Sequence, residues 1–173
     1  MKNVAYLGMY LAYALILSYV ESLIPFSFGI PGIKLGLCNL VVVLLLYLLG
    51  WKEALTVSLL RAVLVGFLFG NPFSILYSLA GSVVSFLCMY VLYRLNRFHV
   101  ATVSICGGIM HNMGQLAVAA ILIDSYYVAY YVPVLLVAGA LTGCVIGVLA
   151  YEIGKRLQKV MQRSDKGYNQ QRE

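Results

Sequence analysis

The stretch from Ser104 to Ala120 reads SICGGIMHNMGQLAVAA and combines an apolar background with three polar side chains. His111, Asn112 and Gln115 fall within about one helical turn, and His111 and Gln115 are spaced i and i+4, so they share a helix face. On a lipid-facing helix these groups would have no hydrogen-bond partner, which costs free energy. We therefore predict that this face points into a helical bundle, where it either lines a ligand site or bonds to neighbouring helices.

The composition is that of an integral membrane protein. Hydrophobic residues make up 62% of the 173 positions and charged residues only 10%, whereas a soluble domain has about 25% charged residues. The net charge of +6 does not indicate nucleic-acid binding, because half of the basic residues follow residue 154. A basic segment after a final membrane span is the usual positive-inside signal, so we expect a bilayer and no nucleic acid as partner.

Apolar runs predict six membrane-spanning helices. A span needs about 20 mostly apolar residues, and glycines and prolines end the first three runs. The predicted spans are Val4–Ile24, Leu35–Leu49, Ala54–Phe69, Phe73–Tyr93, Val100–Ile123 and Val132–Ile153. The second and third are short for a full crossing. We expect an all-α integral membrane protein, with a six-helix transmembrane domain over residues 1–154 and a basic cytoplasmic tail over residues 155–173.

The distribution of basic residues predicts the orientation. One set of helix ends holds the basic tail together with Lys2, Lys52, Arg94 and Arg97, whereas the other set holds only Lys34. Both termini are therefore expected in the cytoplasm, in a multi-pass protein of a bacterial cell membrane. Four tyrosines then lie on the outer side as an interfacial belt or as a lid over a ligand: Tyr126, Tyr127, Tyr130 and Tyr131.

Arg61 lies near the middle of the third predicted span, where a guanidinium costs at least about 2.5 kcal/mol. It should face the bundle interior at a depth similar to that of His111, given the helical rise of about 1.5 Å per residue. In one interpretation it bonds to backbone carbonyls, and in the other it joins a polar ligand-binding layer. The residues predicted to bind a ligand are Lys34, Asn39, Arg61, His111, Asn112 and Gln115.

Two further polar residues flank the loop between the first and second predicted spans. Glu21 closes the first span, and Lys34 opens the second on the same side. They either form a mostly exposed pair that contributes little energy, or Lys34 points with Arg61 into an outward-open pocket. Two cations with few internal anions would favour an anionic or strongly polar small-molecule ligand.

Small residues at four-residue spacing mark faces for close helix packing on the last and first predicted spans. Such faces pack either within the bundle or against a partner protein. The residues are Gly139, Gly143 and Gly147 on the last span, and Gly8, Ala12, Ala14 and Ser18 on the first.

Several chemistries lack their residues. The chain has only two aspartates, Asp124 and Asp165, and no aspartate pair that could hold Mg²⁺ on a diphosphate. It has no phosphate-binding loop for ATP hydrolysis. The four cysteines lie in different apolar runs and resemble small apolar residues more than metal ligands. No catalytic residue and no metal site are therefore predicted.

Three stretches resemble the Gx transporter family, which is also catalogued as heptaprenyl diphosphate synthase component I. They are Pro31–Gly50, Ser78–Tyr90 and Ser104–Ala119. The motifs PG-x-KLGL-x-N and H-N-x-GQL carry most of the resemblance, which extends from about Val4 to Ile153. The family is similar to the substrate-binding S components of energy-coupling factor (ECF) transporters.

The resemblance implies a six-helix, S-component-like bundle with a ligand pocket toward the outer face. In S components, small residues on the first helix contact a coupling subunit, and separate ATPases drive the cycle. Gly8, Ala12, Ala14 and Ser18 are the candidates for that contact here. The resemblance also implies two alternatives: a membrane accessory of electron transfer that binds a flavin or quinone and a redox partner, or a non-catalytic component of heptaprenyl diphosphate synthesis.

Overall fold

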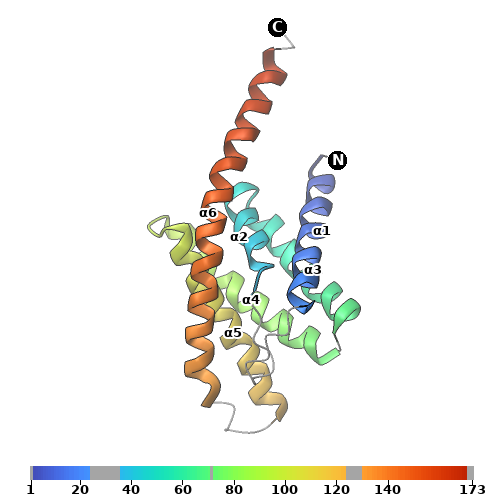
Figure 1. The fold of residues 1–173 in the computed structure, drawn as a ribbon, viewed down its shortest axis with the longest axis vertical. Coiled ribbons are helices and arrows are strands. Elements are labelled where there is room, and N and C mark those ends of the chain that lie inside the picture. The colour runs from blue at the N-terminus through green and yellow to red at the C-terminus, as the bar shows by residue number, and fades with distance from the viewer. Residues whose placement is uncertain (1, 24–35, 71, 124–129, 171–173) are drawn as a thin grey trace.

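A computed structural model of the chain describes residues 2–23, 36–70, 72–123 and 130–170. These ranges contain six α-helices and no β-strand (Figure 1). The helices are α1 (Lys2–Leu23), α2 (Asn39–Leu48), α3 (Trp51–Phe69), α4 (Pro72–Leu95), α5 (Val100–Ile123) and α6 (Val132–Gln170). The predicted all-α class is confirmed. The N-terminus and the C-terminus lie toward the same end of the bundle.

The helix bounds follow local chemistry. Gly50 has a φ of 123° and its N–H bonds to the carbonyl of Leu45, so it ends α2 and lets α3 begin at once. As a result α3 begins at Trp51, three residues before the predicted span. Pro72 occupies the first position of α4, where its missing N–H costs nothing. The last helix passes the predicted span end and continues to Gln170.

Within the described ranges, four helices are long and apolar enough to cross a membrane. The candidate spans are Val4–Leu23, Pro72–Leu95, Val100–Leu122 and Val132–Lys159. At about 1.5 Å per residue, the ten residues of α2 extend about 15 Å, half of a hydrocarbon core of about 30 Å. The chain is therefore a multi-pass membrane protein. Six complete crossings, and the side of the membrane on which the termini lie, remain predictions.

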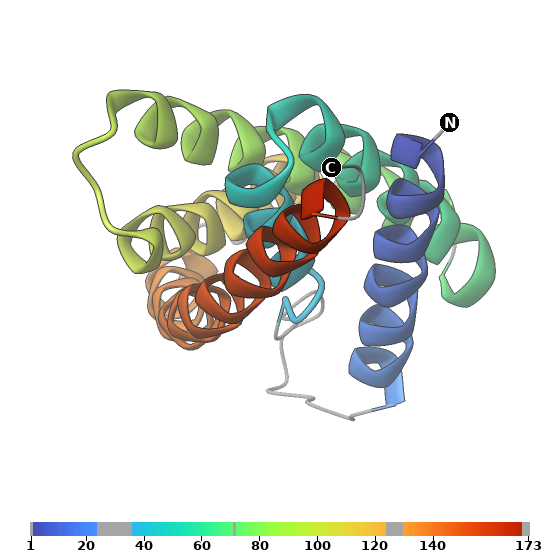
Figure 2. The ribbon, with the colours of Figure 1, turned by 90° about the horizontal axis from the view of Figure 1, so that it is seen from above.

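The short helix α2 forms the centre of the bundle. Every residue from Val41 to Leu46 is buried, so all faces of the helix are covered, as expected for one that is apolar all round. It packs against α3 and α6, with lighter contacts to α1 and α5 (Figure 2). The described chain resumes at Gly36, and the burial of α2 holds the short segment of residues 36–38 in place.

The glycines of α6 lie against α5 in the same chain. A Cβ added at Gly139 would lie 2.8 Å from the carbonyl oxygen of Gly108, and one at Gly143 would lie 2.7 Å from that of Ser104. A Cβ at Gly147 would lie 2.6 Å from the Cα of Ala101. Because no side chain fits in these places, the backbones of α5 and α6 approach each other closely.

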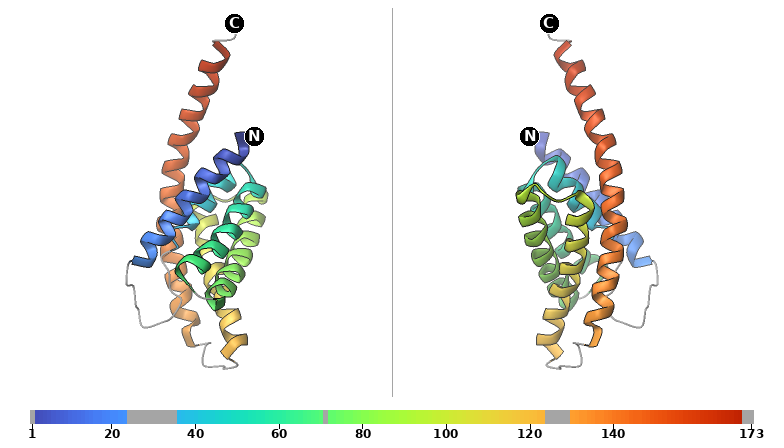
Figure 3. Two further views of the ribbon diagram at one scale, coloured as in Figure 1. Left: turned by 90° about the vertical axis from the view of Figure 1, so that its right-hand side faces the viewer. Right: turned by 90° about the vertical axis from the view of Figure 1, so that its left-hand side faces the viewer.

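Helix α1 is more loosely attached. It lies at the side of the bundle, against α3 and to a lesser degree α2 (Figure 3). Its small residues divide between two faces: Ala14 and Ser18 are buried, whereas Gly8 and Ala12 are exposed. Within the described chain, no atom outside the helix lies within 4 Å of a Cβ added at Gly8.

Candidate functional site

A polar cavity of about 210 Å³ lies between α1, α3 and α4. It is next to the turn from α3 to α4, at the end of the bundle opposite the two termini. Six of its lining residues are polar: Ser18, Glu21, Ser22, Arg61, Ser74 and Ser78. The others are Val65, Gly66, Phe69 and Gly70.

Arg61 is the charged centre of this cavity. Only 6% of the residue is exposed. Its Nη1 contacts Cys38 Sγ, and its Nη2 donates a hydrogen bond to Ser82 Oγ at 3.3 Å. Its Nε makes no hydrogen bond within the described part of the chain. Cys38 and Ser82 are both uncharged, so this buried guanidinium keeps a strong capacity to bind an acidic group.

Glu21 is the second charged group that lines the cavity. It is only 8% exposed, and its Oε1 accepts a hydrogen bond from the backbone N–H of Gly36. Gly36 adopts a left-handed φ of 69°, which a glycine tolerates without strain. Of the two interpretations of the sequence, the mostly exposed Glu21–Lys34 pair does not fit this buried carboxylate, which the segment before α2 contacts through Gly36. Lys34, its predicted partner, lies outside the described residues.

Serines supply most of the remaining polar surface. The hydroxyl of Ser18 donates a hydrogen bond to the carbonyl oxygen of Ala14 at 2.8 Å, and that of Ser22 donates one to the carbonyl oxygen of Tyr19 at 2.7 Å. Their oxygen lone pairs therefore remain available to accept hydrogen bonds from a ligand. On α4, Ser74, Ser78 and Ser82 follow one another at four-residue spacing and share a face. This repeat was visible in the sequence, and it is the signal that our sequence analysis missed.

The polar residues of α5 do not line this cavity. Asn112 donates a hydrogen bond from Nδ2 to the carbonyl of Leu135 on α6 at 2.9 Å. The Nε2 atoms of Gln115 and His111 lie 3.2 Å apart on the same helix. A Cβ at Gly81 of α4 would lie 3.0 Å from Cε1 of His111. Arg61 reaches Ser82 and His111 reaches Gly81, so the two side chains lie at the same level of α4 but do not share this cavity.

The other predicted residues lie apart from the cavity or outside the described ranges. Asn39 begins α2 and is half-buried, with its Nδ2 close to Gly36. Tyr130 and Tyr131 are exposed just before α6. Tyr126 and Tyr127 are not described. Over the described ranges, no three His, Cys, Asp or Glu side chains gather as a metal-binding group. Ligand binding by Lys34, Asn39, His111, Asn112 or Gln115 stays a prediction.

Comparison with known proteins gives the family. The heptaprenyl diphosphate synthase component I family matches residues 10–153, which extend from α1 into α6 and include all the cavity-lining residues. The chain therefore belongs to the heptaprenyl diphosphate synthase component I family. No curated protein matches the chain.

Proposed function

We propose that this family member is the ligand-binding membrane subunit of a transporter, similar to an S component, and that its ligand occupies the cavity between α1, α3 and α4. One observation carries the proposal: a buried arginine, whose hydrogen-bond partners are neutral, lines a cavity with five other polar side chains. An intramembrane charge is expensive, and a functional role is its default explanation.

The cavity favours a small ligand with both acidic and hydrogen-donating groups. An acidic group would accept charge-assisted hydrogen bonds from Arg61. A hydroxyl or ammonium group would be bound by Glu21 and by the serine oxygens of α1. The volume of about 210 Å³ is below the range of about 300–1,000 Å³ for pockets that hold drug-sized ligands. A flavin or quinone ring system therefore fits this site less well than a small zwitterion or hydroxy acid.

The topology supports entry from the outer side. The cavity is at the end opposite the termini, and the basic residues at the end with the termini favour the cytoplasm for that end. Helices α2 and α3 extend in opposite directions, and both lie within the bundle (Figure 1). We infer that this pair completes a six-helix architecture, with α2 buried as its centre.

Transport would need energy from partner subunits, because the sequence lacks a phosphate-binding loop. The exposed side of α1 at Gly8 and Ala12 is our candidate for contact with a coupling subunit, since small residues permit close helix approach. The family match favours a second candidate function, a non-catalytic membrane component of heptaprenyl diphosphate synthesis.

Native mass spectrometry of gently purified protein, with extraction of bound small molecules, tests the proposal. We expect a small polar ligand in the wild-type protein. Its retention should fall about tenfold or more in Arg61→Gln, because a hydrogen bond to a charged group contributes about 1.5–3 kcal/mol. Arg61→Lys should retain more ligand than Arg61→Gln, because it keeps the charge.

Thr56→Val is the matched control on α3. Thr56 is exposed, and its hydroxyl donates only to the carbonyl of Lys52 in its own helix at 2.8 Å, so ligand retention should not change. A ligand that stays bound equally well to folded Arg61→Gln would reject this site. Prenyl chain elongation that requires this polypeptide, without any small polar ligand, would support the synthesis role instead.

A further inference from the structure

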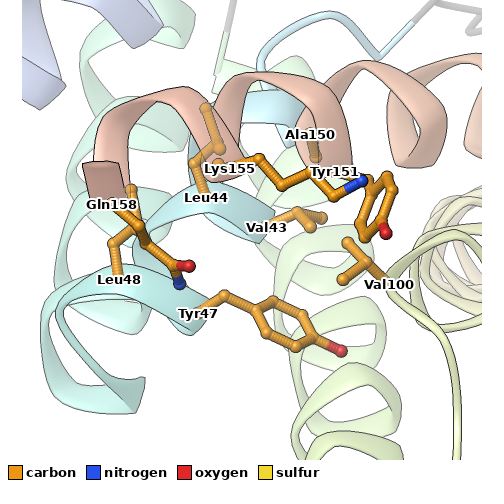
Figure 4. Close-up of a pocket in the computed structure, with 10 residues that line it drawn as sticks. Val43, Leu44, Tyr47, Leu48, Val100, Ala150, Tyr151, Lys155 and Gln158 are labelled. Carbon is orange, nitrogen blue, oxygen red and sulfur yellow. The ribbon is translucent and has the colours of Figure 1, made fainter. Parts of the chain in front are cut away.

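A second cavity, of about 140 Å³, lies between α2, α6 and the start of α5 (Figure 4). It is at the same end of the bundle as the termini, away from the Arg61 cavity. Its wall is mostly aliphatic, with Lys155 and Tyr151 together on its polar side and Gln158 apart from them in Figure 4. The lining residues are Val43, Leu44, Tyr47, Leu48, Val100, Ala150, Tyr151, Gly154, Lys155 and Gln158.

The cavity lies at the depth of a membrane interface. From Val132 to Lys155, α6 rises about 35 Å at about 1.5 Å per residue, slightly more than a hydrocarbon core of about 30 Å. Aromatic residues of the kind enriched at interfaces pair at this end: the Tyr47 and Tyr93 rings are 5.0 Å apart, and the Trp51 and Tyr90 rings 5.7 Å. The aliphatic wall is therefore at a depth suited to the first carbons of lipid chains.

The polar side of the cavity carries a positive charge. The Nζ of Lys155 lies 3.9 Å from the centre of the Tyr151 ring, and Figure 4 shows the two side chains together above Val100. His99 also contacts Tyr151, and the centres of the two rings are 4.6 Å apart. Glu152 interacts electrostatically with Lys155 from outside the cavity, and no carboxylate is among the lining residues. Within the cavity wall, the charge of Lys155 therefore complements an anionic group.

We propose that this cavity binds an anionic phospholipid of the surrounding bilayer, with the start of one acyl chain between α2 and α6 and the phosphate at Lys155. Basic pockets between membrane helices at the cytoplasmic surface are suited to such headgroups. The Gln158 amide and the tyrosine hydroxyls offer further hydrogen-bond donors. At about 30 Å³ for each water-sized group, the cavity has room for about five. It thus holds the start of a chain, and the rest extends into the bilayer.

Lipid titration followed by native mass spectrometry tests this site in the full chain. The probes are dioleoyl phosphatidylglycerol, dioleoyl phosphatidylcholine with the same chains and no net charge, and farnesyl diphosphate. We expect the wild-type protein to bind phosphatidylglycerol about fivefold more tightly than phosphatidylcholine. Lys155→Gln should remove this preference. Arg156→Gln removes the same charge from the next residue, which does not line the cavity, and should keep it.

A second pair of variants tests the chain-binding part. A Cβ at Gly154 would meet only Leu44 Cδ2, at an ordinary 3.7 Å. Gly154→Ala should therefore bind lipid normally, whereas Gly154→Leu should fill the cavity and abolish phosphatidylglycerol binding. The proposal is overturned by an equal loss in Lys155→Gln and Arg156→Gln, by full binding in Gly154→Leu, or by bound farnesyl diphosphate that phosphatidylglycerol does not displace. None of these outcomes depends on the Arg61 cavity.

Discussion

The α5–α6 interface and the space between α1, α3 and α4 solve the same problem in opposite ways. Both regions bring membrane helices together without a hydrophobic driving force, since lipid is as apolar as the helices. Between α5 and α6, glycines bring the two backbones into direct contact. Between α1, α3 and α4, serines and two charged residues surround an open cavity instead. The α5–α6 interface has no room for a further methyl group at its glycines, whereas the space between α1, α3 and α4 retains unfilled volume and polar groups.

This difference separates polar groups that connect two helices from polar groups that line a cavity. Asn112 is polar and 7% exposed, but its side chain connects α5 to the backbone of α6 at the packed interface. Arg61 is equally buried, but it lines empty volume, and its hydrogen-bond partners among the described residues, Cys38 and Ser82, are neutral. Burial of a polar group therefore does not by itself indicate a ligand site. The volume beside the group, and the charge of its partners, make the distinction.

The largest expected effect comes from one methyl group at the packed interface. Gly143→Ala places a Cβ 2.7 Å from atoms of Ser104 and Ile105 on α5, so the two helices must separate. We expect a loss of about 1–3 kcal/mol of stability, typical of overpacking. Thermal denaturation of the detergent-solubilised protein, followed by size-exclusion chromatography, measures this loss as a lower melting temperature.

Gly8→Ala is the matched control for this prediction. It makes the same chemical change on a helix face where the added methyl group meets nothing within 4 Å in the described chain. Its melting temperature should equal or slightly exceed that of the wild-type protein, because alanine favours the helix over glycine. Equal destabilisation by the two substitutions would show that α5 and α6 are not held together by close backbone contact.

A smaller effect is expected from the polar residues of α5. Asn112→Leu removes the hydrogen bond to the Leu135 carbonyl on α6 and should destabilise the protein by about 1 kcal/mol. Gln115→Leu removes a contact within α5, so it should lower the melting temperature less. If Gln115→Leu has normal stability but no longer binds the ligand, then His111 and Gln115 contribute to ligand binding, as the sequence predicted.

The sequence was sufficient for the helices because their signals are local. Apolar runs placed all six, the first three of them ended by glycine or proline, and the fifth helix was predicted with the bounds that the structure shows. The extent of α2 was overestimated, since apolar composition does not reveal where hydrogen bonding begins. The number of full crossings was not resolved either: α3 is long enough, but Lys52, Glu53 and Arg61 reduce its apolar character.

The site was harder to predict because it depends on helix rotation. Arg61 was identified from its charge alone, which is a strong signal in a membrane segment. Its grouping with His111 assumed that similar depth implies a shared pocket, yet the two approach neighbouring residues of α4, Ser82 and Gly81. One interpretation placed Glu21 in a mostly exposed pair, because nothing in the sequence shows that the segment before α2 covers its carboxylate. The position of one helix against another is a property of packing, which periodicity does not specify.

The smallest expected effect on stability, and the most informative about function, comes from filling the polar cavity. Ser78→Val adds apolar volume on α4 beside Arg61, where the cavity of about 210 Å³ can receive it. Because no backbone must move, the free energy of unfolding should change by no more than about 0.5 kcal/mol. Ligand retention should nevertheless be lost, since the added methyl groups occupy the volume in front of the guanidinium. A large fall in melting temperature would mean that this region is as tightly packed as the α5–α6 interface. Unchanged stability with unchanged ligand would place the ligand elsewhere in the bundle.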